Sequence, residues 1–219
     1  MPRILFEKTG NAVWMSHLDL MRLFQRAFKR AGFPLVHTNG FNPRPSVSIA
    51  LPMSVGIESV CELLDFELDC ETVDFDQLRD QLNSALVPGV RVIQAYDTGR
   101  KLKELSYLNC AVSLEYDNGV PECAQSKLRQ LFQQESLIVP KKGKNGTTDQ
   151  QIAPLIKRIE IVEAGEKELI IDTVVCCQNP TLNPMQLVAA IDIYLPECKP
   201  DFAKCKRIEI LDVNYIVFR

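Results

Sequence analysis

The sequence predicts an α+β fold made of two ferredoxin-like (βαββαβ) halves packed together. In residues 1–98 the apolar patterns follow the order β-α-β-β-α-β, which is the split βαβ arrangement. After the charged segment 98–105 (TGRKLKEL) a similar order returns in outline. We therefore expect a first half at 1–98, with a basic helix and a GFNPRP loop, and a second, less regular half at 99–219.

The elements of the first half follow from the spacing of its apolar residues. The segment 46–52 (SVSIALP) alternates apolar and polar residues, as a half-buried strand does. The segment 74–86 places Phe75, Leu78 and Leu82 on one helical stripe. The expected elements are an opening strand or hairpin-like extension at 3–8 and 12–15, strands at 46–52, 61–68 and 90–96, and helices at 16–31 and 74–86.

The second half has weaker patterns and no clear residue-level repeat of the first. Asn183 and Pro184 mark the start of its second helix, because asparagine caps helices and proline suits the first turn. A hairpin turn is expected at 164–166, within two strands spanning 156–175. The other expected elements are strands at 108–116, 136–140 and 206–218, helices at 121–135 and 183–195, and a polar loop at 141–150.

The composition is that of a globular protein that works in water. The 219 residues are 46% hydrophobic and 24% charged. No stretch approaches the roughly 18 apolar residues that a membrane span needs, and the first residues lack the apolar core of a signal peptide. We therefore expect a cytoplasmic protein without a membrane partner.

The eight cysteines do not form a metal-binding pattern. None are spaced as CxxC, and no CxxxCxxC run is present to hold an iron–sulfur cluster. Isolated cysteines favour free thiols in a reducing compartment, most of them packed as small hydrophobic residues. The sequence therefore predicts no metal site and no cofactor in this chain.

The net charge of −3 hides an uneven distribution. Residues 1–50 carry seven basic and two acidic side chains, a balance of +5, whereas the remainder carries 18 basic and 26 acidic side chains, a balance of −8. An acidic protein is a poor candidate for indiscriminate nucleic-acid binding. A basic region confined to one part of the chain fits a specific polyanionic partner, and the alternative is a solvated helix face.

The basic residues gather on the predicted helix 16–31. Ser16 is suited to cap this helix, with Asp19 placed to complete a capping box. Arg22, Arg26 and Arg30 recur at four-residue steps and form a stripe on one side.

The loop that follows the helix is the most specific feature of the sequence. In the segment 40–45 (GFNPRP) two prolines stiffen the backbone around Arg44. Asn42 and Arg44 are thus presented next to the arginine stripe, and Phe41 could stack on a base. The alternatives are a loop that only connects strands and a phenylalanine that fills the core. A phosphate-bearing ligand explains the combination best.

The two histidines, His17 and His37, both lie near these basic residues. Such a pair could act as general acid and base on an RNA 2′-hydroxyl, with His17 and Asp19 as the candidate catalytic residues. The alternative is that each histidine makes a local hydrogen bond. No Walker A, HExxH, GxSxG or dinucleotide motif is present.

The run from SHLDLMR through RAG, GFNPRP and ALP to GIES resembles the bacterial radical-SAM-linked protein family, a domain of unknown function found alone or C-terminal to radical SAM proteins. The similarity is strong over residues 3–68 and looser elsewhere. Some members of that family carry histidine at the position of Arg44, which argues against a histidine-dependent reaction at the loop. The resemblance implies a cytoplasmic bacterial protein that works beside a radical SAM enzyme, and it assigns no catalytic residue.

Three functions remain open. The first is an accessory protein that binds RNA, with tRNA as one candidate, for modification by a radical SAM enzyme. The second is an adaptor that docks the radical SAM partner without nucleic acid, and the third is a metal-independent RNA-processing enzyme using His17. The sequence favours binding over catalysis by this chain alone. The residues expected to contact RNA or phosphate are Arg22, Arg26, Arg30, Phe41, Asn42 and Arg44.

Overall fold

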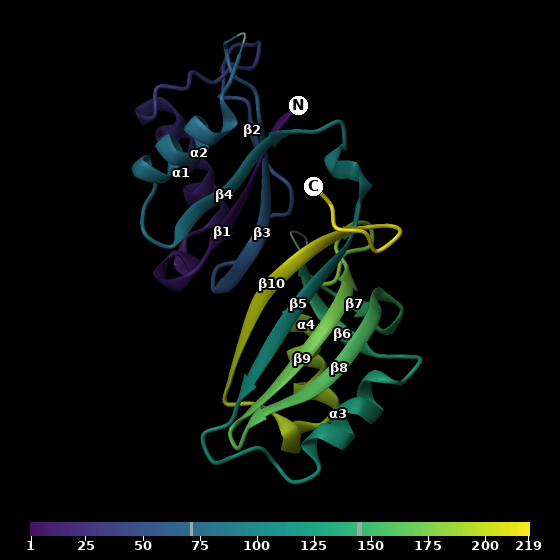
Figure 1. The fold of residues 1–219 in the computed structure, drawn as a ribbon. Coiled ribbons are helices and arrows are strands. Elements are labelled where there is room, and N and C mark those ends of the chain that lie inside the picture. The colour runs from purple at the N-terminus through teal and green to yellow at the C-terminus, as the bar shows by residue number, and fades with distance from the viewer. Residues whose placement is uncertain (71, 144–145) are drawn as a thin grey trace. The chain divides into compact units, whose positions relative to one another are not determined.

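The chain forms two compact units, which are described separately (Figure 1). The computed structural model describes residues 1–70, 72–143 and 146–219, apart from the side chains of residues 142, 163 and 164. The N-terminal unit comprises Met1–Glu104 together with Arg219, and the C-terminal unit comprises Leu105–Phe218. The division expected after residue 98 falls a few residues before Glu104.

The N-terminal unit is a small antiparallel sheet with two helices. Its elements are β1 (Pro2–Lys8), α1 (His17–Arg30), β2 (Val47–Ile49), β3 (Ile57–Phe66), α2 (Phe75–Ala85) and β4 (Val90–Asp97). The strands lie in the order β4-β1-β3, and the short β2 pairs with β3. Every pairing is antiparallel. This unit therefore has the predicted β-α-β-β-α-β order.

Aromatic contacts fix α1 on the sheet. The ring of Phe24 meets Phe6 of β1 edge to face at 4.7 Å between centroids, and Phe28 lies 4.9 Å from Phe66 of β3. All four rings are fully buried, so they supply much of the hydrophobic stabilisation of this unit. The second helix is held differently: the side chain of Asn83 on α2 bonds both the N–H and the carbonyl of Val92 on β4.

A buried ion pair crosses the sheet between β1 and β3. Arg3 and Asp65 are directly opposite in register, and their side chains are 0% and 9% exposed. Arg3 Nε donates to Asp65 Oδ1 at 2.5 Å and Nη2 donates to Oδ2 at 3.1 Å. The same Nη2 donates to the carbonyl of Arg100 at 2.9 Å. Arg3 therefore joins two strands to the segment that follows β4.

The C-terminal unit repeats this plan with an added hairpin. Its elements are β5 (Leu105–Glu115), α3 (Ala124–Phe132), β6 (Ile138–Gly143), β7 (Gly146–Gln151), β8 (Ile156–Gly165), β9 (Glu168–Cys176), α4 (Met185–Tyr194) and β10 (Phe202–Asp212). The antiparallel sheet has the order β10-β5-β9-β8, and β6 pairs with β7 in a separate hairpin. The α+β class is thus confirmed. In the N-terminal unit, β1 lies between β4 and β3, and β2 lies beside β3. In the C-terminal unit, apart from the β6–β7 hairpin, β5 lies between β10 and β9, and β8 lies beside β9.

Three sequence-based assignments were wrong. In the segment 12–15, residues 12–14 belong to a 3-10 helix, Gly10–Trp14, which begins where Gly10 adopts a positive φ of 54°. Of the loop expected at 141–150, residues 144–145 lie outside the described residues, whereas 141–143 belong to β6 and 146–150 to β7. The residues of β7 are polar and mostly exposed, so no apolar alternation revealed this strand. The last strand ends at Asp212 because its side chain accepts the N–H groups of Asn214 and Ile216 and turns the chain.

The cysteines behave as the sequence predicts. All eight are free thiols, and five of them are buried: Cys61, Cys110, Cys177, Cys198 and Cys205. Burial raises the pKa of Cys177 to about 12, which removes its thiolate at neutral pH. Cys177 should therefore be chemically inert in the folded protein, and the other buried cysteines are protected by their lack of contact with solvent.

We expect iodoacetamide at pH 8 to alkylate the exposed Cys70 and Cys123 in the native protein and to leave the five buried cysteines unmodified until denaturant is added. Peptide mass spectrometry measures this directly. Rapid native alkylation of Cys177 would contradict the burial described here.

Replacing Asp65 should destabilise the protein strongly. Asp65→Asn removes the negative charge that faces the buried Arg3 guanidinium, and removal of one member of a buried pair costs about 3–5 kcal/mol. The free energy of unfolding from urea denaturation measures the loss. Asp76→Asn, which alters an exposed pair with Arg79 on α2, should leave the urea midpoint nearly unchanged. Equal effects of the two substitutions would contradict a structural role for the buried pair.

Candidate functional site

The N-terminal unit contains a cleft of about 1100 Å³. Four segments meet around it: one side of α1, the chain around β2, the end of β3, and the segment that follows β4. The lining residues are Met1, His17, Leu18, Met21, Arg22, Gln25, Thr38, Asp65, Phe66 and Glu67, with 44–48 and 98–102.

The α1 side of the cleft begins at a well-formed helix cap. The Ser16 hydroxyl accepts the N–H of Asp19 at 3.2 Å, which confirms the predicted start of the helix. The carboxylate of Asp19 accepts a bond from this hydroxyl at 2.7 Å, in place of the backbone N–H that a full capping box would use. The cap orients the first turn so that His17 faces the cleft.

Residues 36–46 form a narrow arm on the second side of the cleft. His37 and Pro45 are bridge partners, and Ser46 N–H donates to the carbonyl of Val36 at 2.7 Å. Two hydrogen bonds between Thr38 and Arg44 close the arm. The Thr38 N–H donates to the Arg44 carbonyl at 2.9 Å, and the Thr38 hydroxyl accepts the Arg44 N–H at 3.0 Å. Arg44 is thereby held at the base of the arm, where it lines the cleft.

The tip of the arm presents the remaining loop residues to solvent. Phe41 is completely exposed, so the alternative that it fills the core is wrong. Asn42 is also exposed, and neither residue lines the cleft.

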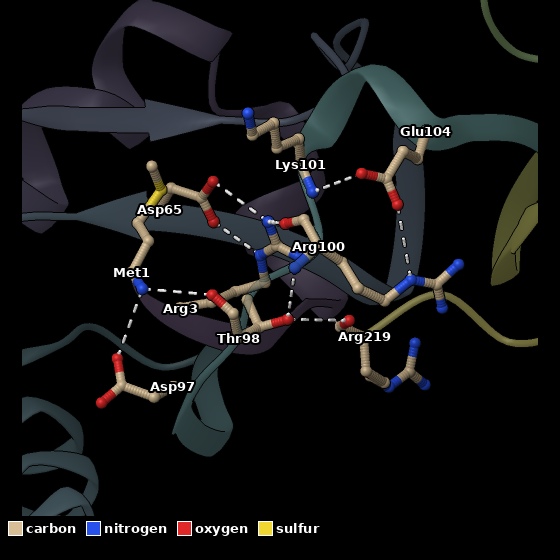
Figure 2. A network of polar contacts seen from close by, with 9 residues as sticks. All are labelled: Met1, Arg3, Asp65, Asp97, Thr98, Arg100, Lys101, Glu104 and Arg219. Atoms are coloured by element: carbon tan, nitrogen blue, oxygen red, sulfur yellow. Dashed lines mark hydrogen bonds and ion pairs between the residues drawn. The ribbon is translucent and has the colours of Figure 1, made fainter.

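The segment after β4 supplies basic groups that sequence reasoning missed (Figure 2). Lys101 N–H donates to Glu104 Oε1 at 3.1 Å, and the Arg100 guanidinium lies 3.9 Å from the same carboxylate group. Arg100 N–H also donates to the Thr98 hydroxyl at 3.1 Å. Both residues are among those that line the cleft, although the sequence prediction treats the charged run TGRKLKEL only as a boundary between halves. The cluster of cations in this run was the available signal.

The lining of the cleft carries an excess of positive charge. Its basic side chains are Arg22, Arg44, Arg100 and Lys101. Of its two carboxylates, Asp65 is neutralised by the buried Arg3, which leaves Glu67 against the four cations. Four basic groups around one hollow raise the local potential and favour an anionic ligand, although the whole chain carries −3.

The structure brings only part of the arginine stripe into the cleft. An α-helix turns about 100° per residue, so each four-residue step rotates a side chain by about 40°. Arg26 and Arg30 are therefore turned progressively away from Arg22 and lie exposed outside the lining. Arginines repeated every four residues were predicted to share one face of the helix, but their positions spiral around the helix axis.

The two histidines occupy different hollows. His17 is half-buried in the cleft, whereas His37 lines an adjoining cavity. Asp19 is engaged elsewhere: it bonds Ser16 and lies 3.5 Å from the guanidinium of Arg22. Of the candidate catalytic residues, the cleft therefore contains His17 alone.

Burial raises the pKa of Tyr96, which faces Arg3 across β1 and β4, while the guanidinium of Arg3 opposes this effect. Tyr96 is therefore a neutral phenol next to the ion pair.

Within the described ranges, no group of three or more His, Cys, Asp or Glu side chains is placed to hold a metal ion. Among the described helices, none has the length and apolar character needed to cross a membrane.

The sequence profile of one protein family matches residues 2–184 of this chain; the family is described as "Uncharacterized protein conserved in bacteria (DUF2344)". This match confirms the predicted kinship with a bacterial family of uncharacterized function. The linkage to radical SAM enzymes stays a prediction. No curated protein matched the chain.

Two solved structures show similarity over nearly the whole chain. A chain in a crystal structure of a Cbf5-Nop10-Gar1 complex is 10% identical, with a TM-score of 0.54, and the match covers 95% of this chain and 48% of that one. A chain of an archaeal box H/ACA sRNP Nop10-Cbf5 complex is also 10% identical, with a TM-score of 0.43 and coverage of 94% and 46%. The present chain thus spans about half the length of these two neighbours. The first likeness supports a shared α+β fold.

Proposed function

This chain belongs to the DUF2344 family of proteins conserved in bacteria, and we propose that it binds RNA phosphates in the basic cleft of its N-terminal unit. One observation carries the proposal: Arg22, Arg44, Arg100 and Lys101 come from three separate segments and line the same hollow. Residues so far apart in the chain gain nothing in stability from gathering like charges. An anionic ligand accounts for the arrangement.

Two of these cations form long ion pairs at or near the surface. Arg22 is 66% exposed, and its pairing with Asp19 at 3.5 Å is solvated. The pairing of Arg100 with Glu104 at 3.9 Å is longer still. Exposed pairs of this kind contribute little stability, so exchange of the carboxylate for a phosphate is inexpensive. Guanidinium groups are well suited to this exchange because they bind phosphate through two parallel hydrogen bonds.

The dimensions favour a polymer over a small anion. The cleft of about 1100 Å³ slightly exceeds the roughly 300–1000 Å³ of typical small-molecule sites, and it is bordered by the exposed arm. The fully exposed Phe41 at the tip of this arm has no packing role, whereas aromatic side chains in that position stack on unpaired bases. We therefore propose RNA, with tRNA as one candidate, as the ligand.

We further propose that both units are variants of the ferredoxin-like fold. The strand order supports this: in each unit the first strand lies between the third and fourth, and two helices connect the strands. In the C-terminal unit the β6–β7 hairpin would then be an insertion between the first helix and the second strand.

The chain would act as an accessory protein beside a radical SAM enzyme in RNA modification. The sequence resemblance described above supports this partner. The competing proposal is an adaptor in which the cleft docks an acidic surface of the partner without nucleic acid. Co-purification from the native host at low salt, with and without nuclease, separates the two: an RNA-dependent complex supports the first, and a nuclease-resistant one supports the second.

We expect the double substitution Arg22→Ala with Arg44→Ala to weaken RNA binding at least tenfold. Each lost phosphate contact should also reduce the slope of log affinity against log salt by about 0.7 for single-stranded RNA. Fluorescence anisotropy with labelled total tRNA and synthetic oligonucleotides, measured between low and moderate salt, gives both quantities.

The pair Arg26→Ala with Arg30→Ala is the matched control, because it also removes two positive charges, from positions on α1 that lie outside the cleft. This variant should bind RNA nearly as tightly as the wild type. Equal losses in the two double variants would show that only net charge matters and would refute the cleft as the binding site.

A second candidate function follows from the position of His17 in the cleft. If the chain cleaves RNA, the wild type should shorten bound RNA, and His17→Ala should abolish cleavage while preserving affinity. Under our proposal RNA stays intact with either protein, and His17→Ala changes affinity less than threefold. Denaturing gel electrophoresis of RNA after prolonged incubation decides between them.

A further inference from the structure

A second cavity of about 510 Å³ adjoins the basic cleft within the N-terminal unit. Its walls include Gln25, Lys29, Phe33, Pro34, Leu35 and His37. Gln25 and Pro45 line both hollows, so the two share a wall. A ligand that occupies the cleft can therefore place one of its groups in this side cavity.

The side cavity is preformed by the end of α1. Gly32 ends the helix with a positive φ of 78°, and Phe33 N–H donates back to the carbonyl of Phe28 at 3.0 Å. The chain that follows is attached to the end of β3, since Leu35 is a bridge partner of Leu68 and the Pro34 carbonyl accepts from Asp69 N–H. These bonds fix the apolar wall before any ligand arrives.

The chemistry of the walls suits a flat ring with polar edges. Phe33, Pro34 and Leu35 provide apolar surface, and Phe33 is only half-buried, so part of its ring is accessible. His37 and Gln25 can each donate or accept a hydrogen bond, and Lys29 can donate. Apolar walls with a few polar groups are typical of sites that hold an unstacked base.

We propose that this cavity receives one unpaired nucleobase of an RNA strand whose phosphates lie in the basic cleft. The inference rests on the proposed function and narrows it: the ligand is single-stranded RNA, or a single-stranded loop of a folded RNA. A base within a duplex is stacked and paired, so it cannot enter a side cavity without first being extruded. The phosphate contacts position the strand, and the side cavity recognises the base.

Three probes separate base recognition from phosphate recognition. They are a labelled single-stranded RNA 12-mer of mixed sequence, the same 12-mer annealed to its complement, and an abasic 12-mer with the same phosphate backbone. Insertion of one base should make the single strand bind about tenfold tighter than the abasic strand, since alanine substitution of aromatic groups that hold a base has an effect of this size. The duplex should also bind more weakly than the single strand.

Substitutions in the cavity should remove this difference. Phe33→Ala and His37→Ala are expected to reduce the affinity for the single strand toward that for the abasic strand, while the affinity for the abasic strand stays unchanged. Phe202→Ala is the matched control, because it removes an exposed ring in the C-terminal unit. Thermal unfolding of each variant establishes that it is folded, and His37 is exposed, so its loss should not disturb folding.

The outcomes distinguish the two proposals. Equal affinity for all three probes, with a loss in the Arg22 and Arg44 double variant, would overturn base insertion and leave the phosphate cleft standing. If none of the probes binds and an acidic protein is captured instead, both proposals fail. A preference for the single strand that survives Phe33→Ala and His37→Ala would place base recognition elsewhere and would also overturn the inference.

Discussion

The buried ion pair between Arg3 and Asp65 is the constraint on which the candidate site depends. Two charges removed from water are tolerated when their geometry is good and further hydrogen bonds support the pair. Here the carboxylate accepts two bonds, and the guanidinium also donates to the Arg100 carbonyl at 2.9 Å. The pair thus holds the segment after β4 against β1 and β3. This segment carries Arg100 and Lys101 into the lining of the cleft, so the position of two surface cations follows from a contact in the sheet.

The same pair shapes the electrostatics of the cleft. A lone aspartate at the end of β3 would cancel part of the positive potential and repel phosphate. Because the buried Arg3 neutralises Asp65, Glu67 is the one carboxylate among the described lining residues that reduces the positive potential of the four basic residues. The Arg3–Asp65 pair contributes no net charge to the cleft, and the exposed basic residues attract the anionic ligand. Exposed cations are screened by salt and buried pairs much less so, which implies that ligand binding should weaken with ionic strength while the architecture of the site does not.

Local signals in the sequence were sufficient for most elements but not for the site as a whole. The Ser16 cap, the stripe of α2 and the strand order of the first half depend on neighbours a few residues apart, and these predictions agree with the structure. The 3-10 helix at Gly10–Trp14 was missed because short helices leave little periodicity. Arg100 was missed for a different reason: its contribution depends on a contact with Arg3, 97 residues earlier in the chain. Of the residues predicted to contact RNA or phosphate, Arg22 and Arg44 line the cleft, whereas Arg26 and Arg30 lie outside it because a four-residue spacing spirals around the helix.

The division between cleft and side cavity suggests how an acidic protein could select one RNA. Phosphate contacts alone attract any nucleic acid, and they fix register without reading bases. Four cations that must first release Asp19 and Glu104 give only moderate attraction, and the net charge of −3 adds none at a distance. Under our proposals, appreciable affinity therefore requires a second contribution, which a base stacked on the exposed Phe41 and a base in the neighbouring cavity would provide. A ligand that must fill both hollows is a single-stranded loop and not a helical region of the same RNA. A helical region can place its phosphates in the cleft, but its paired bases cannot enter the side cavity.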